Sequence, residues 1–249
     1  MNEIPVIIPL GNGSIKEDWE LRILLRSIEK HLEGHGRIYL ATMHCPNWLN
    51  DAMIEVVPLD DPYSSNKDAN LHYKTMTVIE RFNLDEFIFC ADDNVFLRAV
   101  EARGIPVLYN PRGREAFQQG KGWGARVRHT LEWAESKGMH LAWNYECHAP
   151  QVFCGKRILK RLKKEDYASQ PGLTIYTTWR VLEGVNWGLP QSDHKWTFQG
   201  DCSIMDFSDD ALCSREFLGY NDAAVAGGII QRLRKMFPEK SIYEKEDSL

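Results

Sequence analysis

The sequence predicts an α/β fold with a mainly parallel central sheet that carries helices on both faces. Three observations predict it. Short, almost continuously apolar segments recur along the first hundred residues, as in PVIIPL at 5–10. Segments with helical periodicity lie between them, and this alternation is typical of parallel sheets that are buried on both sides. The chain of 249 residues, 43% of them hydrophobic, is long enough for one large core.

The first predicted helix shows how these elements are recognised. Leu21, Leu24, Leu25 and Ile28 recur at the spacing that places them on one helical face. GNGS, after the first strand, is typical of a turn or loop. The predicted order is strand 5–10, helix 19–32, strands 37–42 and 54–59, helix 70–82 and strand 86–91.

The second half of the chain has a different composition. Residues 110–128 contain four glycines and five basic residues, which predicts a loop that faces a ligand. Residues 170–200 are rich in Trp, Thr and Gly, and we expect them to be mostly irregular. Helices are predicted at 129–138, 156–167, 211–220 and 222–237. Because no linker divides the chain, we expect one domain over residues 1–249.

Charge and cysteine content argue against several classes of protein. The net charge of −5 argues against a general nucleic-acid coat but allows a local basic face. No apolar run approaches the ~20 residues of a membrane-spanning helix, and MNEIPVIIPLGNG lacks the positive leader of a signal peptide. The six cysteines have no CxxC spacing, which favours free thiols over zinc or disulfides. We therefore expect a cytoplasmic protein.

The stretch FIFCADDNVFL at 87–97 is the main candidate for chemistry. A strand-like apolar run ends there in two adjacent carboxylates, Asp92 and Asp93. Open α/β sheets bind ligands beyond the carboxyl ends of their strands, and adjacent hard oxygen ligands suit Mg²⁺ or Mn²⁺. This layout is typical of nucleotide-sugar transferases of the GT-A type, in which the ion holds the donor diphosphate. The alternative is that the residues only form a turn.

Several segments, in order along the chain, share the motifs of one known family. ELRILLRSIEKHLEGHGRIYLATMHCPNWL at 20–49 is the longest, and FIFCADDNVFL, HAP at 148–150 and FPEKSIYE at 237–244 follow it. Together they resemble the Stealth family, whose members transfer sugar phosphates from nucleotide sugars in microbial capsule synthesis. The resemblance spans most of the chain and implies a GT-A-like, Rossmann-like fold. The altered opening strand VIIPLGNGS and the basic middle of the chain favour a divergent member that transfers the sugar alone.

The resemblance also implies a donor site. Asp92 and Asp93 are expected to hold the metal against the diphosphate. Arg22 and Arg26, four residues apart on one helical face, are expected to meet the leaving phosphate. The alternative for the two arginines is a solvated helix face with acidic neighbours. Further donor-pocket residues are expected within 5–13 and 66–74, namely Leu10, Gly11, Asn12, Asn70 and Lys74.

His148 is the predicted base for the acceptor hydroxyl. It falls on the family's His-x-Pro element, and the unperturbed pKa of histidine lies close to working pH. The alternative is a hydrogen-bonded histidine beside a turn. Glu146 and Asp201 are further candidates for the base or for a metal ligand, and His194 is a weaker one.

A concentration of basic residues predicts the acceptor side. Six of the nine residues from 156 to 164 are basic, and 110–128 adds five more. They indicate either a solvated helix and loop or a groove for a polyanionic acceptor, with Trp123 available for stacking. DNA with hydroxymethylated bases and an anionic polysaccharide would both fit.

The predicted reaction is metal-dependent transfer of a sugar from a nucleotide sugar to an acceptor hydroxyl. Residues 1–100 would form the donor-binding half and residues 101–249 the acceptor-binding half. Transfer of sugar-1-phosphate to a polysaccharide is the alternative. A non-catalytic module that binds nucleotide sugars is the second alternative.

Overall fold

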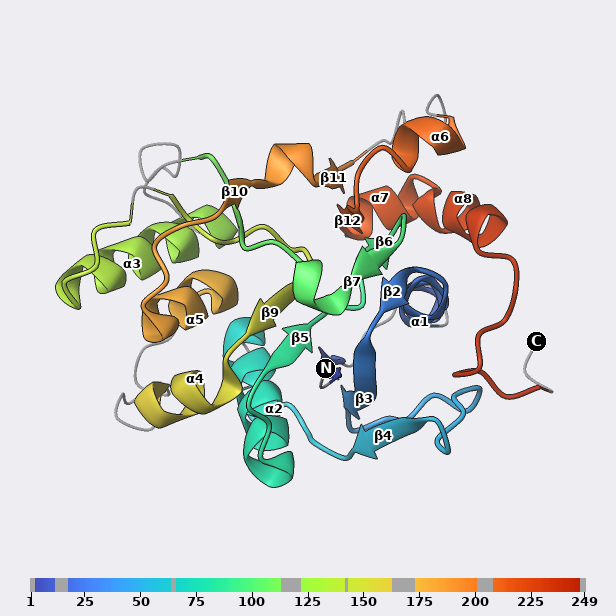
Figure 1. Ribbon diagram of the computed structural model, residues 1–249, viewed down its shortest axis with the longest axis horizontal. Coiled ribbons are helices and arrows are strands. Elements are labelled where there is room, and N and C mark those ends of the chain that lie inside the picture. Colours follow the sequence, from blue (N-terminus) through green and yellow to red (C-terminus); the bar gives the residue numbers. More distant parts are fainter. Residues whose placement is uncertain are drawn as a thin grey trace.

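The computed structural model describes residues 3–11, 18–63, 66–112, 122–141, 143–162, 173–200 and 208–246 (Figure 1). Two predicted site residues, Asn12 and Asp201, lie outside the described residues, as do residues 113–121 of the predicted loop at 110–128. Within the described part of the chain, no helix combines the length and the apolar character needed to cross a membrane.

A five-stranded sheet with the order β4-β3-β1-β5-β9 forms the centre of the molecule. Four strands run parallel, and β9 is antiparallel to β5. The strands are β1 (Ile4–Pro9), β3 (His35–Ala41), β4 (Ile54–Val57), β5 (Phe87–Phe89) and β9 (Gln151–Phe153). The predicted α/β class with a mostly parallel sheet is confirmed, and the first four of these strands overlap the apolar runs that predicted them.

The direction in which the chain adds strands reverses at β1. Helix α1 (Trp19–His31) leads from β1 to β3, and β4 follows on the same side of β1. Helix α2 (Lys67–Phe82) then returns the chain to β5, on the other side of β1. The connections that leave the carboxyl ends of β1 and β5 therefore diverge. Such a switch point is where open α/β sheets form their ligand crevice.

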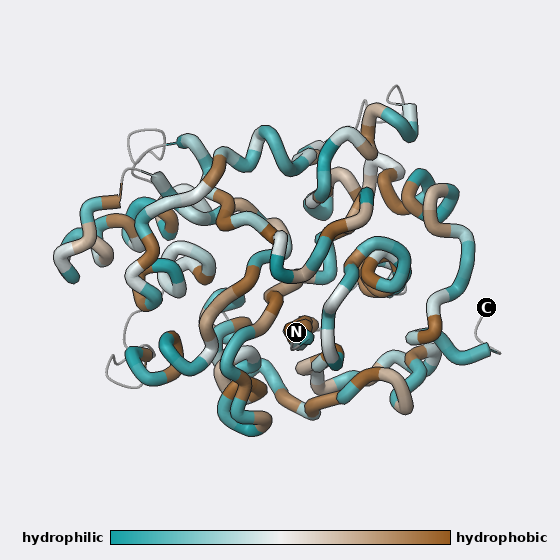
Figure 2. Tube along the Cα trace, in the orientation of Figure 1, coloured by the Kyte–Doolittle hydropathy of each residue, from teal (hydrophilic) through white to brown (hydrophobic). Residues whose placement is uncertain are grey.

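Helix α1 is buried along most of its length because it lies between two hydrophobic cores. Leu21, Leu24, Leu25 and Ile28 pack into the core of the main sheet, as their spacing predicted. Ile23 packs into a second core on the other side of the helix. In Figure 2 the hydrophobic residues are concentrated on the central strands, while hydrophilic residues are frequent on the outer loops and helices.

The second core belongs to a three-stranded sheet with the order β11-β12-β6. Its strands are β6 (Asn94–Phe96), β11 (Lys195–Phe198) and β12 (Phe217–Tyr220), and it packs with α7 (Asp222–Ala226) and α8 (Ile229–Met236). The predicted helix at 211–220 is wrong, since α6 (Asp209–Leu212) is followed by the buried strand β12. The predicted helix at 222–237 is two helices, divided at Gly228, whose φ of 96° only glycine adopts easily.

The prediction of mostly irregular structure at 170–200 is also wrong. Helix α5 (Ile175–Glu183) lies there, and every one of its residues is buried. Trp179 makes edge-to-face contacts with Phe87, Phe89 and Phe153 of the main sheet. Ile175, Trp179 and Leu182 recur at helical spacing, but the prediction followed the Trp, Thr and Gly content of the segment and overlooked this period.

The remaining elements are short or peripheral. Helix α3 begins six residues before the predicted 129–138, and α4 covers the described part of the predicted 156–167. The two helices are α3 (Trp123–Ser136) and α4 (Gly155–Leu162). Two short strand pairs are β2 (Leu32–Glu33) with β7 (Val100–Glu101), and β8 (Leu108–Tyr109) with β10 (Leu189–Pro190). Two 3₁₀ helices are η1 (Ala102–Gly104) and η4 (Gln191–Asp193).

Candidate functional site

Asp92 and Asp93 lie at the switch point, in the turn that follows β5. Asn94 holds this turn from two directions. Its backbone N–H donates to the Ala91 carbonyl at 3.0 Å, and its side-chain oxygen accepts from the Ala91 N–H at 3.1 Å. Its side-chain amide also donates to Asp93 Oδ1 at 3.1 Å. The residues therefore form a turn, and this turn presents two carboxylates at the carboxyl end of a central strand.

Five carboxyl groups lie within electrostatic reach of one another here, and we call them the carboxylate cluster: Asp18, Glu20, Asp92, Asp93 and Asp222. Burial raises the pKa of Asp93 to about 7, with a further contribution from the charge of Asp92. Burial, followed by the charges of Asp92 and Asp222, raises the pKa of Glu20 to about 7. Burial also raises the pKa of Asp92. A bound cation would relieve this repulsion between like charges.

The cluster offers a cation a partial set of ligands. Among the described residues, no three His, Cys, Asp or Glu side chains are arranged to enclose a metal ion. Mg²⁺ in phosphate-binding sites is commonly held by one or two carboxylates, with water and substrate phosphates completing its coordination. The adjacent pair Asp92 and Asp93 fits that mode of binding.

Lys195, at the start of β11, is a buried cation beside the cluster that the sequence analysis missed. It is 3% exposed, and its Nζ donates to the Cys147 carbonyl at 2.5 Å. Burial lowers its pKa to about 8, while the charges of Cys147 and Asp93 act in the opposite direction. A Cβ atom at Gly219, on the neighbouring strand β12, would lie 2.6 Å from Lys195 Cε. Only glycine at that position leaves room for the lysine.

His148 lies on the same side of the sheet as the cluster and adopts a left-handed backbone with φ of 46°. Its carbonyl accepts a hydrogen bond from Asn94 Nδ2 at 3.0 Å, which ties it to the Asp92–Asp93 turn. The residue is exposed to solvent on one side, and the centroid of its ring lies 5.9 Å from those of the Trp123 and Tyr176 rings. Desolvation by the surrounding protein, followed by the charges of Lys195 and Arg126, lowers the pKa of His148. The imidazole is therefore neutral at pH 7 and able to accept a proton.

Glu146 has a local structural task. It is buried, and its Oε1 accepts from the Thr177 N–H at 2.8 Å in the first turn of α5. Carboxylates at this place satisfy N–H groups that the helix leaves unpaired. Burial raises the pKa of Glu146 to about 7. These contacts favour a capping role over the predicted role as base or metal ligand.

Arg22 and Arg26 form hydrogen bonds with residues near the C-terminal end of the sequence. Arg26 forms two bonds to Glu244, from Nε to Oε1 at 2.7 Å and from Nη2 to Oε2 at 2.9 Å. Its Nη1 donates to the Phe237 carbonyl at 2.9 Å. Arg22 Nη1 also donates to Glu244 Oε2 at 2.9 Å. We call this group the arginine clasp, and its contacts favour a structural role for both arginines over the predicted contact with a phosphate.

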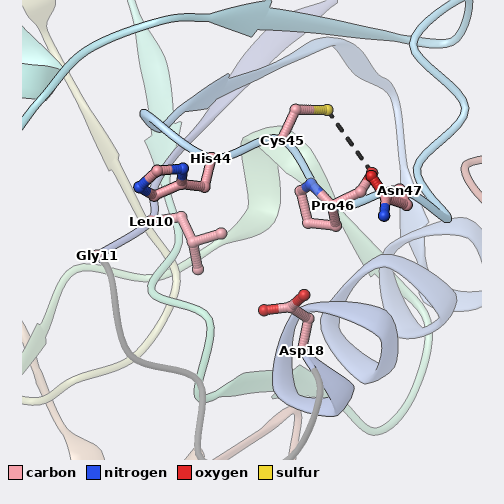
Figure 3. A pocket seen from close by; sticks show the side chains of 7 residues that line it. All are labelled: Leu10, Gly11, Asp18, His44, Cys45, Pro46 and Asn47. Atoms are coloured by element: carbon pink, nitrogen blue, oxygen red, sulfur yellow. Dashed lines mark hydrogen bonds between the residues drawn. The ribbon is translucent and has the colours of Figure 1, made fainter.

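A cavity of about 410 Å³ adjoins the cluster at the carboxyl ends of β1 and β3 (Figure 3). Its lining consists of Leu10, Gly11, Asp18, His44, Cys45, Pro46 and Asn47. In Figure 3 the carboxyl group of Asp18 points into the cavity, opposite Leu10 and Pro46. The predicted donor-pocket residues Leu10 and Gly11 thus line a cavity that shares Asp18 with the carboxylate cluster.

The other predicted donor-pocket residues stabilise the loops around this end of the sheet. Lys74 is 1% exposed, and its Nζ donates to the Leu10 carbonyl at 2.8 Å and pairs with Asp61 at 2.7 Å. The Asn70 side chain bonds to the backbone of Tyr63 in both directions, at 2.9 and 3.1 Å. Both residues therefore hold the segment after β4 in place.

Five of the seven described basic residues in 110–128 and 156–164 have partners within the protein. Arg126 pairs with Asp68 and Lys156 with Asp85, and Arg128 pairs with Glu132 at 3.0 Å. Two further arginines of α4 bond to carbonyl groups at the end of α5, Arg157 to Glu183 O and Arg161 to Leu182 O. These contacts are typical of helix ends and helix faces, and they do not add support for a groove that binds a polyanion.

Comparison with known proteins adds no family to this description. The chain matches no protein-family model, and a search of curated proteins finds no significant relative.

Proposed function

We propose that the protein catalyses metal-assisted transfer of a sugar from a nucleotide-sugar donor to an acceptor hydroxyl group. One observation carries the proposal: Asp92 and Asp93 follow a central strand at the switch point of the sheet, within a cluster of five carboxyl groups. Ligands of open α/β sheets bind at that point, and a cluster of this charge favours a divalent cation. The cavity shared through Asp18 offers space for the nucleoside.

In this proposal Asp92 and Asp93 hold Mg²⁺ or Mn²⁺, which when bound neutralises charge on the leaving diphosphate. The bond between the sugar C1 and the phosphate oxygen breaks, and C1 forms a bond with the acceptor oxygen. His148, neutral at pH 7, accepts the proton of the acceptor hydroxyl. Lys195 adds a positive charge next to Asp93.

Nucleotide release tests the proposal. Purified protein is incubated with UDP-sugars and GDP-sugars and with a candidate acceptor, either duplex DNA with hydroxymethylated bases or an oligosaccharide. The mixtures are prepared with Mn²⁺, with Mg²⁺ and without metal, and the nucleotide products are separated by chromatography. The expected product is the nucleoside diphosphate, formed only with the metal. Asp92→Asn and Asp93→Asn should abolish it, whereas Asp85→Asn, at a carboxylate that is 70% exposed on the surface, should not.

The same assay distinguishes transfer of the sugar alone from the alternative, transfer of sugar-1-phosphate. A nucleoside monophosphate from these donors would show that sugar-1-phosphate moves, because the bond broken would then be the phosphoanhydride. Failure to release any nucleotide with either metal would contradict a transferase function.

A further inference from the structure

Three aromatic side chains lie at or beside the β8–β10 pair, and we call them the aromatic platform: Tyr109, Trp143 and Trp187. Trp187 is 66% exposed and Trp143 41%, and Tyr109 is half-buried. Large apolar side chains that gather on a surface commonly mark a binding site, whereas isolated ones need no explanation.

Local packing holds the platform in one arrangement. The rings of Tyr109 and Trp143 are stacked, with centroids 4.9 Å apart and planes at 14°. Pro190 pairs with Tyr109 in the β8–β10 register. A Cβ atom at Gly188 would lie 2.8 Å from the Val107 carbonyl oxygen and 3.3 Å from Tyr109 Cδ1. Glycine thus allows the chain that carries Trp187 to pass close to the stacked pair.

Two chain segments connect the platform with the carboxylate cluster. Trp143 and His148 are five residues apart, and an extended chain of that many residues spans at most ~18 Å. Leu189 and Lys195 are six residues apart, which corresponds to at most ~22 Å. A ligand of a few linked sugar units would therefore reach from the platform to the site of transfer.

The chemistry of the platform favours an uncharged ligand. No charged residue occurs in its three segments, 107–110, 143–145 and 186–191. DNA carries a negative charge every ~1.7 Å and requires cations along its path, and the nearby described arginines of α3 and α4 already have partners. Flat aromatic faces with polar neighbours suit the apolar faces and the hydroxyl groups of sugar rings.

We propose that the aromatic platform binds a neutral oligosaccharide, which serves as the acceptor for the transfer reaction. The role as acceptor rests on the proposed function, whereas the binding of the oligosaccharide does not. The stacked pair and Trp187 hold sugar units by their apolar faces, and the acceptor end extends along 143–148 toward His148.

A binding experiment tests this proposal without the transfer reaction. Neutral hexasaccharides of glucose, mannose, galactose and N-acetylglucosamine are titrated against the protein, with intrinsic tryptophan fluorescence as the measure of affinity. Indole N–H signals in NMR spectra locate the bound sugar. We expect saturable binding of at least one hexasaccharide, with shifts of the Trp143 and Trp187 signals.

Substitutions of the tryptophans test whether binding of the hexasaccharide depends on the platform. Trp187→Ala and Trp143→Ala should each weaken it by about tenfold, the size expected for a lost stacking contact. Tyr63→Ala, at an exposed aromatic residue away from the platform, should bind as the wild type does. Because Trp187 is 66% exposed, its loss should leave the thermal unfolding temperature unchanged.

Three results would overturn the proposal: absence of saturable binding in the whole panel, equal binding by the tryptophan variants, or tighter binding of duplex DNA that depends on the same tryptophans. Asp92→Asn/Asp93→Asn should bind the hexasaccharide normally. If that binding is intact but the wild type releases no nucleotide from any donor, the proposed function fails while the carbohydrate site stands.

Discussion

The carboxylate cluster and the aromatic platform differ in almost every physical property. The cluster gathers five carboxyl groups and a buried lysine at the ends of the main sheet. The platform has no charged residue in its three segments and lies on a short two-stranded pair. The difference favours a division of roles between a charged donor and a neutral acceptor.

Loss of the carboxylate pair should have the largest effect. Asp92→Asn/Asp93→Asn removes the charges that hold the cation, and we expect Mn²⁺-dependent nucleotide release to fall by roughly 10²–10³-fold. Calorimetric titration should show that Mn²⁺ binding is lost, while hexasaccharide binding is retained. Parallel loss of both ligands would mean that the two regions are one site.

The arginine clasp should affect stability rather than either site. Glu244→Gln leaves Arg22 and Arg26 without their buried counter-charge, which we expect to lower the free energy of unfolding by about 3 kcal/mol. Urea denaturation measures this change. Below the transition the variant should still bind Mn²⁺ and the hexasaccharide with unchanged affinity. A selective loss of affinity for the nucleotide-sugar donor would instead indicate that the two arginines contact its phosphate.

Matched alanine substitutions at two glycines should affect the carboxylate cluster and the aromatic platform separately. Gly219→Ala would press on Lys195 beside the cluster, and Gly188→Ala would press on Val107 and Tyr109 under the platform. Each should destabilise the fold by about 1–3 kcal/mol through overpacking. We expect the first to weaken Mn²⁺ binding alone and the second to weaken hexasaccharide binding alone.

Gly104→Ala is the control for this pair, because its added Cβ would meet its nearest atom at an ordinary 3.5 Å. Both affinities and the unfolding temperature should stay at wild-type values. If both glycine variants weaken the same ligand, the separation of the two regions is wrong.

A smaller effect should appear in the pH dependence of stability. Asp93 and Glu20 have folded-state pKa values of about 7, whereas unfolded carboxyl groups titrate near pH 4. The folded protein thus holds these protons longer, and its stability should fall as pH rises from about 4 to 7. Mg²⁺ binds the deprotonated groups and should raise the unfolding temperature more at pH 8 than at pH 5.5. An equal shift at both pH values would show that these carboxylates do not bind the ion.

Sequence patterns predicted one part of the site because its residues follow a predictable strand. The apolar runs marked β1 and β5, so the positions of Leu10, Gly11, Asp92 and Asp93 at the sheet edge followed from them. Lys195 and Gly219 were missed because β11 and β12 were predicted as irregular chain and as helix. Strand β12 pairs with β6, more than a hundred residues earlier, and β11 pairs with β12. No local pattern contains that information.

The roles of the arginines show a similar limit. Spacing within α1 placed Arg22 and Arg26 on one face, which the structure bears out. Their partner Glu244 lies 218 residues from Arg26 in the sequence, and charge alone does not distinguish a carboxylate of the protein from a phosphate of a ligand. Helix α5 was missed for a different reason, since Ile175, Trp179 and Leu182 have helical spacing that was not weighed against the composition of the segment.

An exchange of metal preference shows whether Asp93 holds a catalytic cation. In Asp93→Cys the hard carboxylate is replaced by a soft thiolate, which prefers Cd²⁺ to Mn²⁺. We predict that nucleotide release by this variant is lost with Mn²⁺ and partly restored by Cd²⁺, in contrast to the wild type. Full activity of the variant with Mn²⁺, or no gain with Cd²⁺ beyond that of Asp93→Asn, would contradict the assignment of Asp93 as a metal ligand.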